Sequence, residues 1–223
     1  MCGRYTLDAS TETLAKAFGV APIGFRVERH WNIAPGQYVI VVRPNKGGRL
    51  ADQARWGLVP AWAKDPSSGP RPINARAETV ATKPTFRDAF RHSRCLVPAS
   101  GFYEWKADGG RKHPWYIHPR DGGLLAFAGL TAVWEGPEGP MRTVCIVTTT
   151  PNELMAPIHD RMPVILPGEA WTPWLDETTP GEVLKSMLVP VSSNHLTAHR
   201  VGHAVGRVQY DGPELIAPDP SAE

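Results

Sequence analysis

Five strand-like segments follow one another between residues 95 and 150, with no helical segment between them. They span residues 95–97, 102–105, 115–117, 124–134 and 141–150, and turns such as Asp108-Gly109-Gly110 separate them. Consecutive strands joined by short turns pair antiparallel, because a parallel pair needs a long crossover. The run excludes a doubly wound parallel sheet. It predicts an α+β fold, mainly an antiparallel sheet curled into a barrel-like core with short peripheral helices.

The remaining segments predict the outer elements of this fold. A β-branched run at 38–42 and a second run at 50–56 flank turn residues and predict a hairpin, and a further strand is expected at 163–166. Residues 57–73 are rich in Pro, Gly and Trp and predict a loop. Helices are expected at 10–19, capped by Ser10 or Thr11 and ended by Gly19, at 84–94, at 169–175, and at 179–188, where Thr179-Pro180-Gly181-Glu182 resembles a capping box.

The length and composition of the chain indicate one domain without a membrane span. The 223 residues are 42% hydrophobic, which is enough for one core, so we expect a single domain over 1–216 and a disordered acidic tail over 217–223. No run of eighteen apolar residues and no signal peptide is visible, which predicts a cytoplasmic protein, or a nuclear one in a eukaryote.

The three cysteines differ in what their positions allow. They are widely spaced and form no CxxC motif, which argues against a disulfide framework and a zinc site, and no cofactor is expected. Cys95 and Cys145 lie in apolar runs and are expected to be inert core thiols. Cys2 is different, because removal of Met1 would leave it with a free α-amine beside its thiol. Such a 1,2-aminothiol forms an imine with an aldehyde and then closes to a thiazolidine.

The charge of the chain is unevenly distributed. The net charge is only +2, but residues 71–112 hold nine Lys and Arg against four Asp and Glu. This basic stretch is compatible with nucleic-acid binding, but by itself it is more typical of an ordinary solvated surface.

Three polar residues stand where strands end or loops begin. Asn74 follows Pro72-Ile73, Glu104 lies between Tyr103 and Trp105, and His159 precedes Asp160-Arg161. Each has an ordinary explanation: a turn residue, a solvent-facing strand position and an ion-paired surface residue. Together with Cys2 they would supply proton transfer and hydrogen bonding for imine formation at a sugar aldehyde.

Six segments carry a specific resemblance. They are Met1-Cys2-Gly3-Arg4-Tyr5, Trp31-Asn32-Ile33-Ala34-Pro35-Gly36, Arg55-Trp56-Gly57-Leu58-Val59-Pro60-Ala61-Trp62, Asn74-Ala75-Arg76-Ala77-Glu78-Thr79, Gly101-Phe102-Tyr103-Glu104-Trp105 and His159-Asp160-Arg161-Met162-Pro163. In this order they resemble the SOS response-associated peptidase (SRAP) family, whose members recognise abasic sites in single-stranded DNA and crosslink to them through the N-terminal cysteine.

The resemblance implies an abasic-site sensor that protects the site as a thiazolidine crosslink, with lyase and self-processing peptidase character. It implies that Cys2 is the nucleophile, Asn74 orients the sugar, Glu104 assists proton transfer at the amine and His159 promotes ring opening. The implied partner is single-stranded DNA with abasic sites, including junctions with duplex, bound by a monomer that associates with the bacterial nucleoid on damage. The positions that match DNA contacts are Arg4, Asn32, Trp62, Arg76 and Arg161. Ala63 stands where some relatives have a second aromatic residue.

The sequence is also compatible with two other functions. A cysteine peptidase would use Cys2 as nucleophile and His159 as base, and would tolerate a blocked α-amine. A non-catalytic single-stranded DNA-binding module would bind intact and abasic strands alike, even without Cys2.

Overall fold

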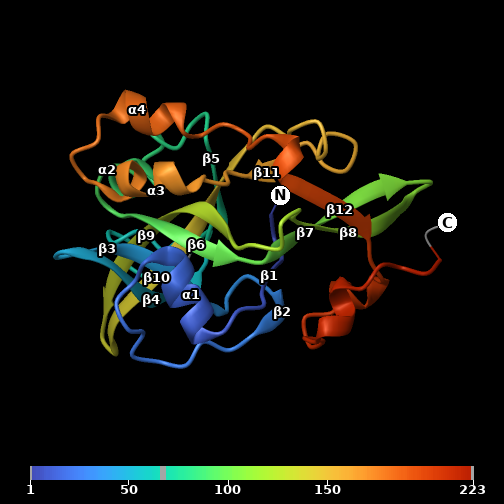
Figure 1. Ribbon diagram of the computed structural model, residues 1–223. Helices are drawn as coiled ribbons and strands as arrows, with labels where there is room; N and C mark the ends of the chain where they lie inside the picture. The colour runs from blue at the N-terminus through green and yellow to red at the C-terminus, as the bar shows by residue number, and fades with distance from the viewer. Residues whose placement is uncertain (1, 66–68, 222–223) are drawn as a thin grey trace.

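The computed structural model describes residues 2–65 and 69–221, and its centre is a closed ring of five strands (Figure 1). β10 (Gly139–Thr149) pairs with β4 (Gly48–Trp56), and the order continues through β3 (Tyr38–Asn45) and β6 (Arg94–Ala99) to β9 (Leu125–Gly136), which pairs again with β10. β5 (Asn74–Arg76) and β11 (Met162–Pro163) add to β10. The predicted barrel-like core is confirmed.

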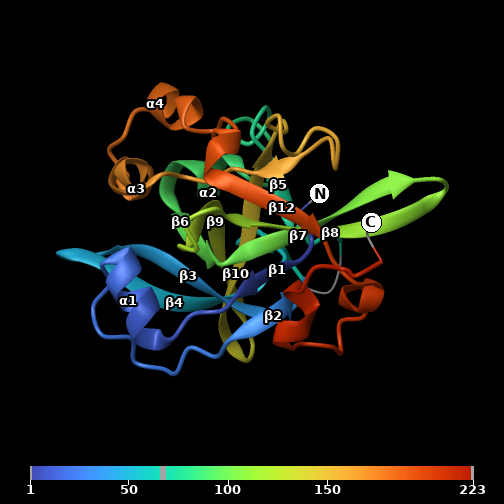
Figure 2. The ribbon, with the colours of Figure 1, turned by 45° about the vertical axis from the view of Figure 1, so that its right-hand side comes forward.

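A second sheet lies against the ring and carries the N-terminus. Its order is β12 (Leu196–Arg200), β8 (Arg111–Pro119), β7 (Gly101–Asp108), β1 (Tyr5–Leu7) and β2 (His30–Ile33). Edge-on aromatic contacts join the two sheets: the Tyr5 ring lies 5.3 Å from that of Trp56, and the Phe127 ring lies 5.9 Å from those of Tyr5 and Phe102. The hairpin of β7 and β8 projects from one side of the molecule (Figure 2).

The helices are short and lie outside the strands, as predicted. α2, α3 and α4 gather at one end of the ring, whereas α1 lies on another side (Figure 1). Their bounds are α1 (Thr11–Phe18), α2 (Arg87–His92), α3 (Gly168–Leu175) and α4 (Gly181–Ser186), with 3₁₀ turns η1 (Ser193–His195), η2 (His203–Gly206) and η3 (Pro213–Ile216). Ser10 caps α1 by accepting from the backbone N–H of Thr13, and Gly19 ends it with φ 58°. The first predicted helix is therefore confirmed at both ends.

Two helix predictions need correction. The helix expected at 84–94 is only α2, and Arg94 instead begins β6 with its side chain 3% exposed. Its guanidinium donates to four backbone carbonyls near the ends of α2 and α3, those of Phe90, Arg91, Trp174 and Asp176. The predicted capping box is also wrong. Pro180 occupies the N-cap of α4, while the Thr179 hydroxyl donates to Pro173 O at 2.7 Å.

The prediction of antiparallel pairing holds for most strand pairs but fails on one side of β10. That strand runs parallel to β4 and to β5. The ring closes through the parallel pair of β4 and β10, because the long segment between these two strands returns the chain to the edge of β4. The strand expected at 163–166 shrinks to β11, with a single bridge between Phe127 and Ile165 beyond it.

The end of the chain turns back along β12. Pro218 forms a β-bridge with Val201, and Asp219 forms an ion pair with Arg200, with 3.2 Å between Oδ2 and Nε. The disordered tail expected over 217–223 stays a prediction, and residues 222–223 of it lie outside the described residues. Met1 and residues 66–68 of the loop predicted at 57–73 also lie outside them. No helix in the described part of the chain is long and apolar enough to cross a membrane.

Candidate active site

Cys2 lies inside the protein at the start of the second sheet. Its side chain is fully buried, although it is the residue next to the chain terminus, and it belongs to the same hydrophobic core as Tyr5 and Trp56. Burial raises the pKa of the Cys2 thiol well above its usual range, and the nearby Glu104 carboxylate raises it further. Near neutral pH the thiol is therefore protonated in the chain that still carries Met1. Cys95 and Cys145 are buried too, as predicted.

Asn74 reaches Cys2 from the other sheet. It begins β5, whose parallel register with β10 places Asn74 opposite Ile146. Its Nδ2 donates to the backbone carbonyl of Cys2 at 3.0 Å. Its Oδ1 is buried and has no hydrogen-bond partner among the described residues. A buried acceptor without a donor is uncommon, so this atom is suited to a donor supplied by a ligand.

Glu104 and His159 face each other beside Cys2. Glu104 lies on β7 and is only 2% exposed, and its Oε2 lies 3.7 Å from His159 Nε2. Burial raises the pKa of Glu104, against the opposing charge of His159. A buried carboxylate with a raised pKa accepts a proton more readily than an exposed one, which suits general base chemistry. Glu104 is thus not the solvent-facing strand residue of the simplest interpretation.

The other ring nitrogen of His159 is held by its own loop. Nδ1 accepts from the backbone N–H of Arg161 at 3.0 Å and lies 2.9 Å from Asp160 Oδ1. The Arg161 contact requires an unprotonated Nδ1, which leaves the proton of the neutral ring on Nε2, facing Glu104. The two contacts fix the orientation of the ring, with Nε2 toward Glu104.

The Arg161 side chain lies at the rim of this group and is engaged within the protein. Its guanidinium binds the Glu78 carboxylate through two bonds of 2.6 and 3.0 Å and donates to Thr148 O at 2.7 Å. This contact lowers the pKa of Glu78. Glu78 belongs to the segment that begins with Asn74, so the ion pair ties the Asn74 segment to the His159 loop. Glu78 was missed from the sequence, although it stands in one of the six segments that carry the family resemblance.

Arg4 and Asn32 form a separate polar group. Arg4 Nη1 donates to Asn32 Oδ1 at 2.7 Å, and Asn32 is only 2% exposed. The Asn32 amide bonds to the backbone of residues 205–210, near the end of the chain. In this structure Asn32 therefore holds the C-terminal segment and is not open to a ligand. Asp211, which binds the backbone of Asn32, was also missed, because nothing near it in the sequence signals a partner 179 positions away.

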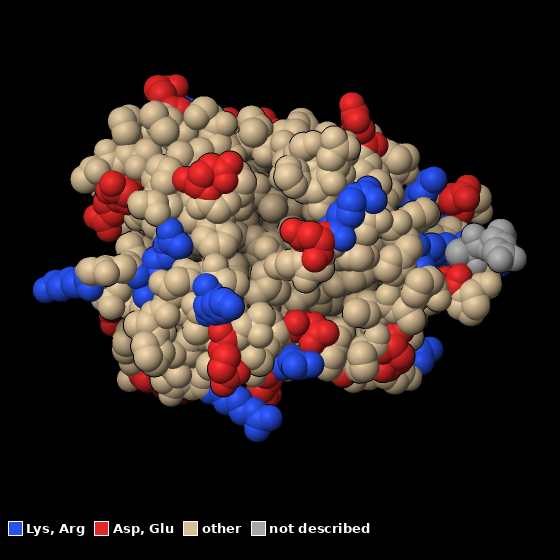
Figure 3. Space-filling view, viewed as in Figure 1, with Lys and Arg blue, Asp and Glu red and all other residues tan. Residues whose placement is uncertain are grey.

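Trp62 and Arg76 lie on the surface. Trp62 is 68% exposed, and the adjacent Ala63 carbonyl accepts from the Trp134 ring nitrogen at 2.7 Å. Arg76 ends β5, two residues after Asn74, and is exposed. The structure thus places the buried Cys2 and Glu104 beside the half-buried Asn74 and His159. On the face shown in Figure 3, Lys and Arg alternate with Asp and Glu, and no large basic patch forms there.

Comparisons with known proteins point to one family. The family model described as SOS response associated peptidase (SRAP) matches residues 1–208. Abasic site processing protein YoqW of Bacillus subtilis is 41% identical over 221 residues, covering 97% of this chain and 99% of that protein. Abasic site processing protein YedK of Escherichia coli is 33% identical over 234 residues, covering 98% of this chain and the whole of that protein.

Solved structures share the fold. A crystal structure of a protein from Bacteroides thetaiotaomicron superimposes with a TM-score of 0.88 over 98% of this chain and all of its own, at 23% identity. A second, from Bordetella bronchiseptica, has a TM-score of 0.78 over 90% of this chain and all of its own, at 27% identity.

Proposed function

Because the chain belongs to the SOS response-associated peptidase family, we propose that it processes abasic sites in single-stranded DNA and links to them covalently through Cys2. The observation that supports this most directly is the burial of the second residue of the chain against Asn74 and beside Glu104. A chain terminus is ordinarily exposed and mobile. Here it is packed among the groups that imine chemistry needs.

The proposed reaction begins with removal of Met1, which converts the amide nitrogen of Cys2 into a primary amine. This amine attacks the aldehyde carbon of the ring-opened abasic sugar, and the aldehyde oxygen leaves as water when the imine forms. The thiol then adds to the same carbon, and its proton passes to the nitrogen. The product is a thiazolidine, and the mass of the adduct is that of protein plus DNA minus one water.

The buried polar groups would share the proton transfers of this reaction. Glu104, with its raised pKa, would take a proton from the amine before attack. His159 would deliver a proton to the ring oxygen of the sugar during opening and to the leaving hydroxyl. Asn74 Oδ1, which is buried without a donor, would accept a hydrogen bond from the amine or from a sugar hydroxyl.

The DNA strand would be held by residues around this group. Arg4, Arg76 and Arg161 would bind phosphates, and the exposed Trp62 ring would stack on a base. Arg161 already forms an ion pair with Glu78, so a phosphate would either bind the guanidinium together with this carboxylate or replace it. Asn32 would act through Arg4, since its own amide is bonded to the C-terminal segment.

Two secondary activities follow from the same groups. An imine intermediate acidifies the neighbouring carbon of the sugar, so strand cleavage by β-elimination is expected as a lyase side reaction. Self-processing of the Met1–Cys2 bond would use the same thiol and acid-base pair. A peptidase that acts on other proteins is less well supported, because it needs a thiol of lowered pKa, whereas burial and Glu104 raise the pKa of Cys2.

A crosslinking assay on denaturing gels tests the proposal. The Met1-less protein should form a covalent band with single-stranded DNA that carries one abasic site and none with the intact strand. Cys2→Ala should lose the band and keep much of its salt-sensitive DNA binding, because phosphate contacts supply that part of the affinity. Cys145→Ala removes a buried thiol on β10 and should keep the band. A band that persists in Cys2→Ala would refute the proposal.

A further inference from the structure

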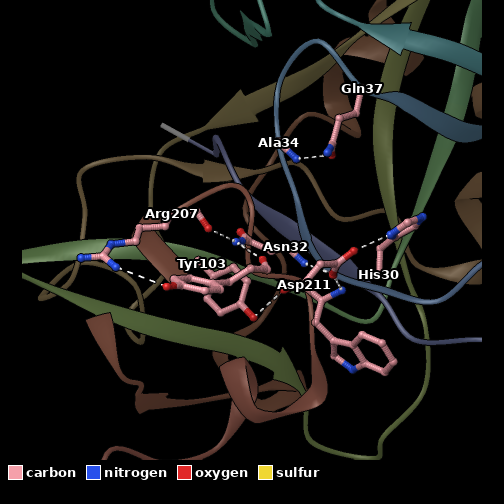
Figure 4. A network of polar contacts seen from close by, with 9 residues as sticks. His30, Asn32, Ala34, Gln37, Tyr103, Arg207 and Asp211 are labelled. Atoms are coloured by element: carbon pink, nitrogen blue, oxygen red, sulfur yellow. Dashed lines mark hydrogen bonds and ion pairs between the residues drawn. The ribbon is translucent and has the colours of Figure 1, made fainter. Parts of the chain in front are cut away.

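The segment that follows β12 crosses the second sheet beside β2. We call residues 203–211 the C-terminal strap; it begins with η2 (His203–Gly206). In Figures 1 and 2 this part of the chain lies next to β2, which comes much earlier in the sequence. Figure 4 shows the polar side chains that tie it there.

Asn32 binds the strap along its backbone. Its Nδ2 lies within hydrogen-bond distance of three carbonyl oxygens, those of Val205 at 3.3 Å, Arg207 at 3.0 Å and Tyr210 at 2.8 Å. Its Oδ1 accepts from Arg4. An amide offers two donor hydrogens, so every polar position of this 2% exposed side chain is engaged. Because all donors and acceptors of this buried amide are hydrogen-bonded, Asn32 fixes the path of the strap.

Asp211 secures the other end of the strap. Its Oδ1 accepts from the backbone N–H groups of Trp31 and Asn32, and its Oδ2 lies 2.6 Å from His30 Nδ1 (Figure 4). The Tyr103 hydroxyl donates to the carbonyl of Trp31 at 2.8 Å. The Asp211 carboxylate therefore binds β2 beside and at Asn32, the residue whose side chain holds the strap. The Tyr103 hydrogen bond in turn attaches β2 to β7.

The strap holds the guanidinium of Arg4. Arg4 Nη1 donates to Val205 O at 2.7 Å, and Nη2 lies 3.4 Å from Gly206 O. The main chain of Arg4 is fixed as well, because its carbonyl accepts from the backbone N–H of Tyr103 at 3.0 Å. Arg4 stands two residues after Cys2. The positive charge beside the proposed reaction centre is thus oriented by residues more than 200 positions away.

We propose that Asn32 and Asp211 are positioning residues that hold Arg4, through the strap, in the orientation that binds a DNA phosphate. This inference rests on the proposed function, in which Arg4 is a phosphate ligand. A free arginine loses rotamer freedom when it binds, whereas one already held by Asn32 Oδ1 and Val205 O has lost it in folding. The strap would thereby contribute to affinity for single-stranded DNA without touching it.

A double-mutant cycle on the affinity for an intact oligonucleotide tests the inference. Arg4→Ala should weaken binding about tenfold, as expected for loss of a charge-assisted contact. Asp211→Ala should weaken it by a similar factor, and adding it to Arg4→Ala should cost nothing further. Asp211→Asn retains an oxygen that accepts from Trp31 and Asn32 and should restore most of the affinity. His30→Ala removes only the exposed partner of Asp211. It should weaken binding by a smaller factor, and this loss too should disappear when Arg4 is already alanine.

The matched control is Asp219→Ala, which removes the same charge from the C-terminal segment but from a residue that pairs with Arg200. It should leave affinity unchanged. The inference would be overturned if the losses of affinity in Arg4→Ala and Asp211→Ala multiplied in the double variant. Wild-type affinity in Asp211→Ala would overturn it as well. Should Asp211→Ala fail to fold, the cycle is made with His30→Ala. Losses of affinity in Arg4→Ala and His30→Ala that multiply in the double variant would then overturn the inference. Failure of the proposed function looks different, because the wild-type protein would then form no crosslink.

Discussion

Replacement of Asn32 by alanine is the sharpest test of how the chain end is fastened. The change removes one accepted bond from Arg4 and two donor hydrogens shared among three strap carbonyls, which amounts to three independent hydrogen bonds. At about 0.5–1.5 kcal/mol each, they contribute about 1.5–4.5 kcal/mol to the free energy of unfolding. The site is 2% exposed, so a small cavity adds to the loss, while water recovers some of the carbonyls. We expect a loss of about 2–4 kcal/mol.

Urea unfolding followed by tryptophan fluorescence and by far-UV circular dichroism measures this loss. For a chain of this length the melting temperature should fall by about 4–16 °C. The control is Asn194→Ala in η1, an exposed asparagine whose replacement should cost less than about 0.5 kcal/mol. A loss below about 1 kcal/mol in Asn32→Ala would mean that the strap is held by other contacts, and the reasoning on Asn32 would fail.

Four further predictions concern the reaction centre and the DNA-binding surface. Glu104→Gln should slow crosslinking about 10²–10⁴-fold and remove the rise of rate with pH that the ionisation of Glu104 produces, as single-turnover rates from pH 5 to 8 would show. Since burial raises the pKa of Glu104, its ionisation in the folded state costs stability as pH rises through that pKa; Glu104→Gln should therefore melt higher than wild type at pH 8, and a lower melting temperature would contradict this. One extra residue retained before Cys2 should block crosslinking, because it turns the amine into an amide, and an unimpaired adduct on gels would exclude the aminothiol mechanism. Trp62→Ala should weaken binding to single strands by about 1–3 kcal/mol in fluorescence anisotropy, and unchanged affinity would show that the exposed ring does not stack.

Local features of the fold were predictable because their causes are local. Ser10 and Gly19 bound α1 by capping chemistry that depends on neighbouring residues alone. Arg94 was misplaced because its partners, such as Trp174 O, lie about 80 residues further on, and no helical periodicity reports them. The parallel pairs of β10 were missed for a related reason. Strand order along the chain predicts adjacent hairpins, whereas β4 pairs with β10 only through closure of the ring, and β5 pairs with β10 outside the ring.

The candidate site divides in the same way. Cys2, Asn74, Glu104 and His159 were identifiable because each stands in a segment with a recognisable pattern, and the structure brings all four together. The sequence assigned Asn32 to the DNA surface. The contacts of Asn32 with the strap could not be predicted, because they arise only where β2 meets residues 205–210 in the folded chain. Asp211 carries no local signal. Its role is visible only once the chain end is placed against β2.

Intact mass spectrometry shows whether Cys2 links covalently to an abasic site. The Met1-less protein is incubated with single-stranded DNA that carries one abasic site, beside an otherwise identical strand without it. We expect a species at the mass of protein plus DNA minus one water, absent from the control strand and from Cys2→Ala. Absence of that species, with Met1 removal and an intact aldehyde both confirmed, would show that Cys2 does not crosslink to abasic sites.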